Sequence, residues 1–185
     1  MIAMEVEVKA KVKDMVELKK KFEDMGASFN TPVSQVDAYF KPKGFDEKPE
    51  GPGSWIVRIR DSNDKKTLTL KALTEILGAW VEYETAIENG EQARKILDTM
   101  GLVNVFTLNK KRSYGKIGEF EVLLDDVKEL GEYLEVALES DEKEKTREKI
   151  INFMKSAGIS ESDIERRGYG EIIGEKLGHR FGGMR

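Results

Sequence analysis

The sequence predicts a mainly β protein of the α+β class, with eight antiparallel strands and a few flanking helices. Two observations support this class. Segments of alternating polar and apolar residues recur along the first 139 residues, and short turn-like stretches such as Ser62-Asn63-Asp64 and Ser113-Tyr114-Gly115 join several of them. Helical periodicity is confined to a few short stretches. So many antiparallel strands are most commonly buried in a barrel or in a two-sheet sandwich.

The first strand shows the alternation most clearly, in Met4-Glu5-Val6-Glu7-Val8-Lys9-Ala10. Successive side chains of a strand point in opposite directions, so Glu5, Glu7 and Lys9 would share one face. Seven later segments alternate in a related way. The eight predicted strands cover residues 2–12, 35–41, 54–61, 66–72, 79–87, 103–112, 116–127 and 133–139.

Helices are predicted between and after these strands. Asp14 is a candidate N-cap of a helix that ends at Gly26, and a second helix over 91–100 stops before Gly101. A third is predicted over 141–157, and Ser160 is a candidate N-cap of a short fourth one. The stretch 41–53 contains three of the four prolines and reads as a long loop, either functional or merely mobile.

The length of 185 residues fits a single domain with a substantial core. Within that domain the barrel or sandwich would occupy 1–139, a helical segment 140–178 and a frayed tail 179–185.

Composition excludes several kinds of function. The net charge of −4 argues against a nucleic-acid partner, and the absence of cysteine removes disulfides and thiolate chemistry. The single histidine, His179, cannot form a two-histidine zinc site. No apolar run approaches the roughly 20 residues of a membrane span, and no signal peptide is visible, so a cytoplasmic protein without membrane contact is expected. The high charge without cysteine also fits a thermophile.

The charged faces of the predicted strands are segregated by sign. Acids dominate strands five, seven and eight, and bases dominate strands three and six. Polar faces of antiparallel sheets usually face solvent. A solvated surface gains nothing from grouping like charges, however, whereas a binding site does. Strand six departs from clean alternation, because Lys110 and Arg112 share the face of Phe106 and Leu108, and a bulge is one explanation.

Bases and acids on separate strands suit a triphosphate bound with a divalent cation. Arginine and lysine satisfy phosphate oxygens with charge-assisted hydrogen bonds. Mg²⁺ or Mn²⁺ prefers one or two carboxylates together with phosphate oxygens and water. The metal ion would neutralise developing charge and orient the attacking oxygen.

These residues resemble the CYTH superfamily, the triphosphate tunnel metalloenzymes, which includes class IV adenylate cyclases and thiamine triphosphatases. The family's ExExK signature corresponds to Glu5-Val6-Glu7-Val8-Lys9. Further matching pieces follow in order across almost the whole chain: Asp37-Ala38-Tyr39-Phe40, Val57-Arg58-Ile59-Arg60, Leu68-Thr69-Leu70-Lys71, Glu82-Tyr83-Glu84, Lys110-Lys111-Arg112, Glu119-Phe120-Glu121, Leu124-Asp125-Asp126-Val127 and Gly131-Glu132-Tyr133-Leu134-Glu135.

The resemblance implies a closed eight-stranded antiparallel barrel, the triphosphate tunnel, with its charges facing inward. It also implies residue roles. Substrate would be bound by Lys9, Arg58, Arg60, Lys71, Lys110, Arg112 and Tyr39. Metal would be held by Glu5, Glu7, Glu119, Glu121 and Glu135, and catalysis would involve Glu5, Glu7, Lys9, Glu119 and Glu121. Supporting acids would be Asp37, Glu82, Glu84 and Asp125.

The chain departs from the family pattern in two places. Glu135-Val136-Ala137 lacks a second acid, and Gly168 replaces the serine of an SYxxLL-like segment that begins Gly168-Tyr169. The resemblance implies an enzyme most like a class IV adenylate cyclase, which converts ATP to cyclic AMP and pyrophosphate. A hydrolase of thiamine triphosphate, tripolyphosphate or a nucleoside triphosphate is the first alternative, and a non-catalytic polyphosphate- or nucleotide-binding module the second. A homodimer is also expected from the resemblance.

Overall fold

A computed structural model describes residues 4–45, 51, 53–63, 65–73, 80–165 and 167–178. The strands in these ranges are β1 (Met4–Lys11), β2 (Val33–Pro42), β3 (Trp55–Ser62), β4 (Lys65–Leu73), β5 (Trp80–Ala86), β6 (Leu102–Ile117), β7 (Phe120–Val127), β8 (Gly131–Ser140) and the short β9 (Ile164–Glu165). The α-helices are α1 (Met15–Asp24), α2 (Gly90–Thr99), α3 (Lys143–Ser156) and α4 (Tyr169–Lys176). All eight predicted strands are confirmed, with shifted ends.

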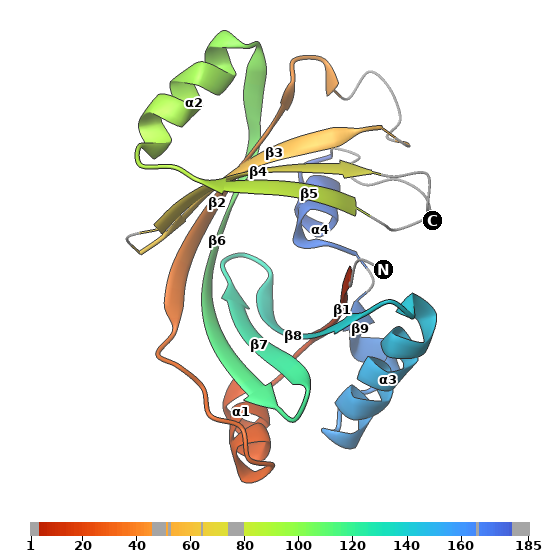
Figure 1. Ribbon diagram of the computed structural model, residues 1–185. Coiled ribbons are helices and arrows are strands. Elements are labelled where there is room, and N and C mark those ends of the chain that lie inside the picture. The colour runs from red at the N-terminus through yellow and green to blue at the C-terminus, as the bar shows by residue number, and fades with distance from the viewer. Residues whose placement is uncertain are drawn as a thin grey trace. The chain divides into compact units, whose positions relative to one another are not determined.

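The strands form an antiparallel sheet in the order β5-β4-β3-β2-β6-β7-β8-β1-β9. This order confirms a mainly β protein of the α+β class (Figure 1). It leaves β5 and β9 as end strands, so pairing among the described residues does not show the closed barrel expected from the sequence. Among the described helices, none combines the length and apolarity that a membrane span requires.

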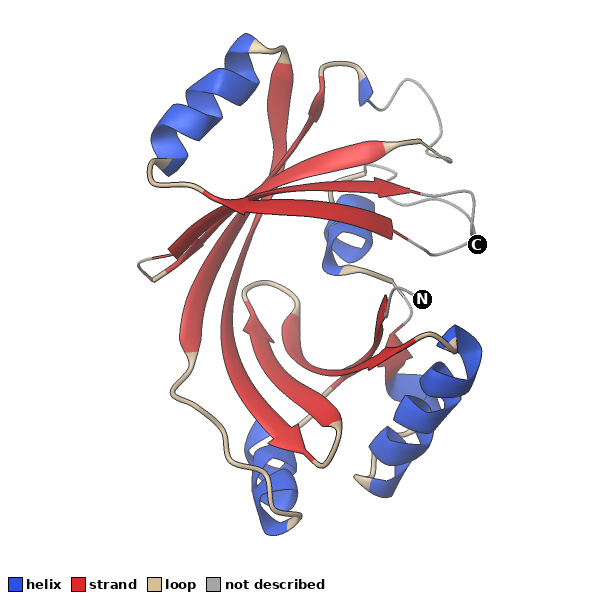
Figure 2. Cartoon of the chain, in the orientation of Figure 1, coloured by secondary structure: helices blue, strands red, loops and turns tan. Residues whose placement is uncertain are grey.

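The chain divides into two compact units, each made of two separate stretches of sequence. The first unit comprises 1–33 and 110–166, and the second comprises 34–109 and 167–185. Strand β6 contributes residues to both units. Strands make up most of the regular structure in each unit, as Figure 2 shows.

In the first unit, helices cover the apolar face of strands β1, β7 and β8. Val8 and Val136 of this face pack with Phe22 of α1 and with Ile150 and Met154 of α3 in one buried cluster. Helix α3 lies against β1 and β8 (Figure 1). Because the strands alternate, this packing leaves Glu7, Lys9 and their neighbours on the opposite face.

The second unit repeats this arrangement with a different helix. Ala38 and Phe40 of β2 pack with Ile59 of β3 and Leu97 of α2 in a second buried cluster. Helix α2 contacts β3 and β4 on this apolar face. The charged residues of β3, β4 and β5 are therefore on the face that α2 does not cover.

The helix ends agree largely with sequence expectations. The Asp14 carboxylate accepts a hydrogen bond from the backbone N–H of Glu17 at 2.9 Å, which confirms it as the N-cap of α1. Gly26, just past the end of α1, has a φ of +99°, a conformation that glycine adopts without strain. Ser160 begins only a 3₁₀ turn over Glu161–Asp163, and its side chain makes no capping hydrogen bond.

The predicted turn at 113–115 is wrong, because β6 continues through it to Ile117. The hairpin turns instead at Gly118, whose φ is +58°, and at Glu119, with Ile117 paired to Phe120. Gly115 lies within the strand for a packing reason. A Cβ at this position would lie 2.5 Å from the Phe29 ring, so only glycine allows the close contact.

Two other expectations concern the loop and the tail. The loop predicted over 41–53 begins later than expected, since β2 extends to Pro42, and residues 46–50 and 52 lie outside the described residues. The tail 179–185 also lies outside them. Strand β9 and helix α4 were not among the predicted elements.

The contact between Gly115 and Phe29 provides a stability test. We expect Gly115→Ala to lower the free energy of unfolding by about 1–3 kcal/mol, because the added methyl group overlaps the Phe29 ring. Urea unfolding measures this change. Gly51→Ala is the matched control, because a Cβ there meets nothing within 4 Å. Equal stability of the two variants would contradict the packing role of Gly115.

Candidate functional site

Arg112 lies at the centre of the charged cluster of the first unit. Its Nε and Nη2 donate to the two carboxylate oxygens of Asp125 at 2.6 and 2.5 Å, and Nη2 also donates to Glu135 at 3.1 Å. Lys110 lies 3.6 Å from Asp125, and Lys9 lies 3.3 Å from Glu135. Five predicted site residues from four strands therefore form one network.

This network is buried, which determines its electrostatics. Asp125 is 0% exposed and Glu135 4% exposed. Burial alone would raise the pKa of Glu135, but the charges of Arg112, Lys9 and Lys110 outweigh it, and the pKa is lowered. Glu135 is therefore ionised at neutral pH and holds two cations in place. Buried charges of this kind are tolerated only when they are paired.

Basic and apolar residues share one face of strand β6, as the sequence indicated. Phe106, Leu108, Lys110 and Arg112 are all buried on the face shared by the charged residues. Pairing with β7 keeps one continuous register from Lys110 to Ile117, so no bulge interrupts this stretch. The cationic face is thus a buried one that includes apolar side chains.

The second unit contains a matching cluster on β2, β3 and β4. Arg60 donates a bidentate pair of hydrogen bonds to Asp37, at 2.6 and 2.7 Å, and Asp37 is 1% exposed. The register places these two residues directly opposite each other. The fork geometry holds the guanidinium in a single orientation.

Arg58 lies on the same face of β3 as Arg60, two residues earlier in the sequence. Its Nη2 donates to Thr69 at 3.0 Å and to Glu84 at 3.1 Å, and the Thr69 hydroxyl donates to Glu84 at 2.7 Å. Partial burial would raise the pKa of Glu84, but the Thr69 hydrogen bond and the Arg58 charge lower it. Lys71 and Glu82 form a further ion pair between β4 and β5.

Buried polar atoms without a hydrogen-bond partner in the described part of the chain occur on this face. The Nε of Arg58 and the hydroxyl of Thr67 are among them. Buried polar groups are nearly always satisfied, so atoms of this kind commonly mark the place of a ligand or water. Arg58 thus combines a fixed guanidinium with a spare donor.

Tyr39 stacks on Phe106, with ring centroids 4.5 Å apart. Burial, followed by the nearby charge of Asp37, raises the pKa of Tyr39 to about 12. The phenol therefore stays protonated at neutral pH and cannot serve as a general base there. It can provide an aromatic face and a hydroxyl donor.

Glu7 and Glu121 stand on either side of a small residue on the charged face. Each pairs in register with Ala137, so the three positions form one row across β1, β8 and β7. Both glutamates are exposed, whereas Ala137 between them is buried. The backbone of Glu5 belongs to the same strand and pairs with Glu139, but the Glu5 side chain lies outside the described residues.

No group of three acidic or histidine side chains that could hold a metal occurs within the described residues. Mg²⁺ and Mn²⁺ commonly use only one or two carboxylates and complete their shell with phosphate oxygens and water. Glu7 and Glu121 fit that smaller requirement. Glu135 is less accessible to a metal because Lys9 and Arg112 occupy its oxygens.

Glu119 lies apart from the cluster of the first unit. It sits in the β6–β7 turn and accepts a hydrogen bond from Lys149 of α3 at 2.8 Å. The strand predicted over 116–127 would include Glu119, but strand β7 begins only at Phe120. Its predicted metal and catalytic roles remain untested.

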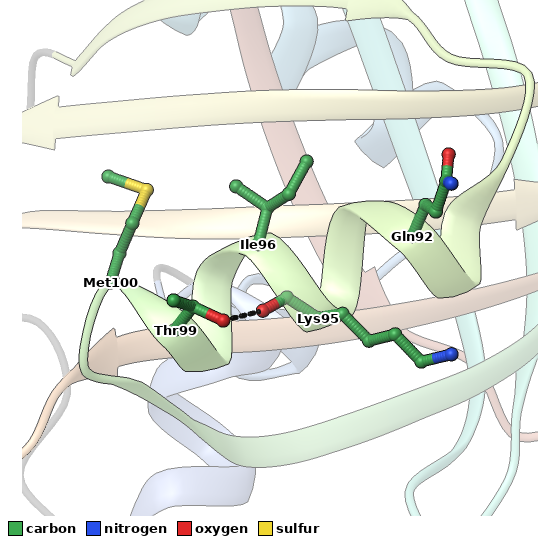
Figure 3. Close-up of a pocket in the computed structure, with 5 residues that line it drawn as sticks. All are labelled: Gln92, Lys95, Ile96, Thr99 and Met100. Atoms are coloured by element: carbon green, nitrogen blue, oxygen red, sulfur yellow. Dashed lines mark hydrogen bonds between the residues drawn. The ribbon is translucent and has the colours of Figure 1, made fainter.

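Sequence reasoning did not select Thr69 as a site residue, although it lies between Arg58 and Glu84 in the hydrogen-bond network. Its position on the polar face of β4, two residues before Lys71, was the available signal. A shallow hollow elsewhere, on the outer side of α2, is lined by Gln92, Lys95, Ile96, Thr99 and Met100 (Figure 3). That hollow includes none of the predicted site residues.

In each unit, paired bases and acids therefore lie on the sheet face opposite the one that α1, α2 or α3 covers. Residues 3–169 match the CYTH domain. The chain belongs to the CYTH family.

Individual relatives cover nearly the full chain. A protein of Methanocaldococcus jannaschii, named as a candidate adenylate cyclase, is 30% identical over an alignment of 178 positions that covers 92% of this chain and 99% of that one. A conserved protein of Pyrococcus furiosus has a solved structure with a TM-score of 0.76 and 29% identity, covering 91% of this chain and 99% of that one. The fold also recurs in a candidate adenylyl cyclase of Hippeastrum, described as having a dominant triphosphatase activity (TM-score 0.64, 17% identity, 97% and 98% covered).

The buried network predicts a pH-dependent role for Glu135. Its lowered pKa means that it stabilises the fold above the usual glutamate pKa of about 4.3, and that this contribution is lost as the pH falls through the lowered value. We therefore expect Glu135→Gln to reduce the free energy of unfolding by about 2–4 kcal/mol at pH 7, and by progressively less below pH ~4.

Urea unfolding of both proteins between pH 3 and pH 8 measures this difference. Glu148→Gln, at an exposed position on α3, is the control and should change stability little at any pH. A constant difference between wild type and Glu135→Gln across the range would rule out the ion-pair explanation.

Proposed function

We propose that this chain is a metal-dependent enzyme acting on a triphosphate, most like a class IV adenylate cyclase that converts ATP to cyclic AMP and pyrophosphate. The observation that carries the proposal is the buried set of bases on the charged faces, where the Nε of Arg58 has no hydrogen-bond partner among the described residues. A polyphosphate chain supplies many acceptor oxygens and the negative charge that such a set calls for.

The bases would bind the phosphate groups, and the acids beside them would orient the bases. Asp37 fixes Arg60, and Asp125 fixes Arg112, each through two hydrogen bonds. Glu84 orients Arg58 and Glu82 orients Lys71, each through a single hydrogen bond to the base. The full set of proposed phosphate ligands is Lys9, Arg58, Arg60, Lys71, Lys110 and Arg112. Preorganised donors of this kind stabilise charge that develops in the transition state.

The metal-binding acids would be Glu7 and Glu121, together with Glu5. When bound, Mg²⁺ or Mn²⁺ would neutralise phosphate charge. We leave Glu119 out of this set because its carboxylate pairs with Lys149 of α3. Glu135 is assigned to hold Lys9 and Arg112 in position.

In the cyclase reaction, the ribose 3′-hydroxyl attacks the α-phosphorus, and pyrophosphate leaves. Tyr39 and Phe106 would contact the part of the substrate that is not phosphate, because their stacked rings offer an apolar surface beside Arg58. The phenol of Tyr39 would act as a donor, since its pKa of about 12 keeps it protonated.

Triphosphate hydrolysis is the second candidate function. In that reaction water attacks the γ-phosphorus of thiamine triphosphate, tripolyphosphate or a nucleotide, and orthophosphate leaves. The same ion-pair networks would serve both reactions. The recurrence of this fold in a Hippeastrum protein described as having a dominant triphosphatase activity supports keeping this alternative. A non-catalytic polyphosphate- or nucleotide-binding module would use the bases but would not need Glu7 and Glu121.

The proposal includes the finer features expected from the sequence. These are a closed eight-stranded barrel forming the triphosphate tunnel, a single domain over 1–185, a cytoplasmic location and a homodimer.

A product assay with one variant tests the proposed function. Purified protein is incubated separately with ATP, tripolyphosphate and thiamine triphosphate, with Mg²⁺ or Mn²⁺, and the products are resolved by chromatography. Cyclic AMP with pyrophosphate is the expected result. We expect Glu7→Gln to reduce turnover about 100-fold or more while the unfolding temperature stays near that of the wild type, because Glu7 is exposed.

Glu148→Gln is the matched control for loss of one exposed carboxylate, and it should retain full turnover. Orthophosphate as the only product would establish the triphosphatase instead. Binding without turnover of any of the three compounds would favour the non-catalytic module. Wild-type rates in Glu7→Gln would remove Glu7 from the site.

A further inference from the structure

Thr67 is a residue of β4 whose side-chain hydroxyl makes no hydrogen bond within the described structure. Thr67 and Thr69 are two positions apart on the same strand, so both side chains are on the charged face of the second unit. The Thr69 hydroxyl accepts a hydrogen bond from Arg58 and donates one to Glu84. The Thr67 hydroxyl is also buried. Of these two threonines, Thr67 therefore keeps an unsatisfied hydroxyl, whereas Thr69 does not.

The strand register places Thr67 beside residues of the proposed phosphate-binding set. Thr67 pairs with Arg60 of β3 on one side and with Ala86 of β5 on the other. Arg58, which pairs with Thr69, is the diagonal neighbour of Thr67. Diagonal neighbours are about 7–8 Å apart at the backbone, a distance that an arginine side chain can span. The Arg58 Nε is likewise buried without a partner in the part of the chain that the structure describes. An unsatisfied N–H donor and an unsatisfied hydroxyl thus lie on adjacent strands of one face.

Packing alone does not account for a threonine at position 67. A buried hydroxyl without a hydrogen bond destabilises a protein relative to a methyl group of the same size. Valine has nearly the shape of threonine and is enriched in strands as threonine is, so it would fill the position without that cost. Buried polar groups that stay unsatisfied are rare in native proteins, and a catalytic role or a bound ion or water explains many of them. The neighbouring bases Arg58 and Arg60 favour an anion as the missing partner.

We propose that Thr67 is a further substrate-binding residue, whose hydroxyl donates a hydrogen bond to an oxygen of the phosphate group that the Arg58 Nε binds. The inference rests on the proposed function and deepens it. Thr67 as a whole is only partly buried, so rotation about its Cα–Cβ bond to another staggered position can turn the hydroxyl toward a bound phosphate. A hydroxyl adds a donor without adding positive charge next to Arg60. It would fix the position of the phosphate group, while the cations supply most of the attraction.

Calorimetric titration with tripolyphosphate tests this role. We expect Thr67→Val to raise the Kd about 10-fold, the loss that corresponds to one hydrogen bond to a charged group. Thr67→Ser retains the hydroxyl and should bind more tightly than Thr67→Val. Thr85→Val is the matched control, because Thr85 is exposed on β5 and pairs with Leu68, away from the charged face. Its Kd should stay within about twofold of the wild type.

The salt dependence of binding distinguishes a lost hydrogen bond from a disturbed set of bases. Thr67→Val removes no charge, so its plot of log Kd against log salt concentration should keep the wild-type slope. A shallower slope would show that the substitution had displaced the cationic side chains, and it would overturn a direct role of the hydroxyl.

Thermal unfolding of the same variants separates binding from structure. Thr67→Val should raise Tm by about 3 °C, because valine occupies the position without a hydroxyl to desolvate. A hydroxyl that is hydrogen-bonded within the fold, for example to a buried water molecule, would instead stabilise the protein. A fall in the Tm of Thr67→Val would therefore assign the hydroxyl a structural role and overturn the proposal.

The outcomes also separate this inference from the proposed function. If the wild type fails to bind tripolyphosphate and is inactive on all three triphosphates, the proposed function fails. If the wild type binds and Thr67→Val binds equally well, the role of Thr67 alone is overturned. Equal weakening in Thr67→Val and Thr85→Val would reduce the effect to a general disturbance of the sheet and would also overturn it.

Discussion

The structure depends on the pairing of charges buried on the sheet faces opposite those that α1, α2 and α3 cover. Asp125 is fully buried, and an isolated carboxylate at that depth would be too costly to keep ionised. Arg112 and Lys110 make it tolerable by placing two cations within 3.6 Å of its oxygens. Because each partner depends on the others, the network fixes the orientation of the bases before any ligand arrives. Asp37 and Arg60 satisfy the same constraint in the second unit.

This pairing also explains how one face can be both stable and ready to bind. Replacing a paired carboxylate by phosphate oxygens would leave a buried acid without its cation, so the buried pairs are better retained when a substrate binds. The donors available to a substrate are then the N–H groups of the bases that make no hydrogen bond to a carboxylate. Arg58 illustrates this, since Nη2 is occupied by Thr69 and Glu84 while Nε has no partner in the described residues. The carboxylates therefore serve mainly to orient the basic side chains.

Much of this arrangement could be predicted from the sequence, because alternation along a strand determines which residues share a face. Arg58 and Arg60 were placed correctly for that reason, as was Asp14 as a helix cap. Alternation does not determine where a strand ends. Gly115 suggested a turn, yet it serves to admit the Phe29 ring, and that contact joins residues 86 positions apart. The position of Glu119 was misjudged as a consequence. Strand β9 has two residues, and only its pairing with β1 defines it.

Selectivity between the two candidate reactions has to come from outside the charge networks, because cyclisation and hydrolysis place the same demands on the bases. The residues able to distinguish adenosine, thiamine or a third phosphate are those that contact the rest of the substrate. Under the proposed function, these would surround Tyr39 and Phe106 in the second unit, where α4 also packs. A Cβ on Gly170 would lie 3.3 Å from the Phe106 ring, so the glycine determines how closely α4 approaches the aromatic pair. Gly168, which replaces the serine of the SYxxLL pattern, lies two residues before Gly170. This departure from the pattern is therefore close to the residues that would contact the organic group of the substrate. Substitutions in this segment should therefore alter the choice of substrate more than the binding of tripolyphosphate.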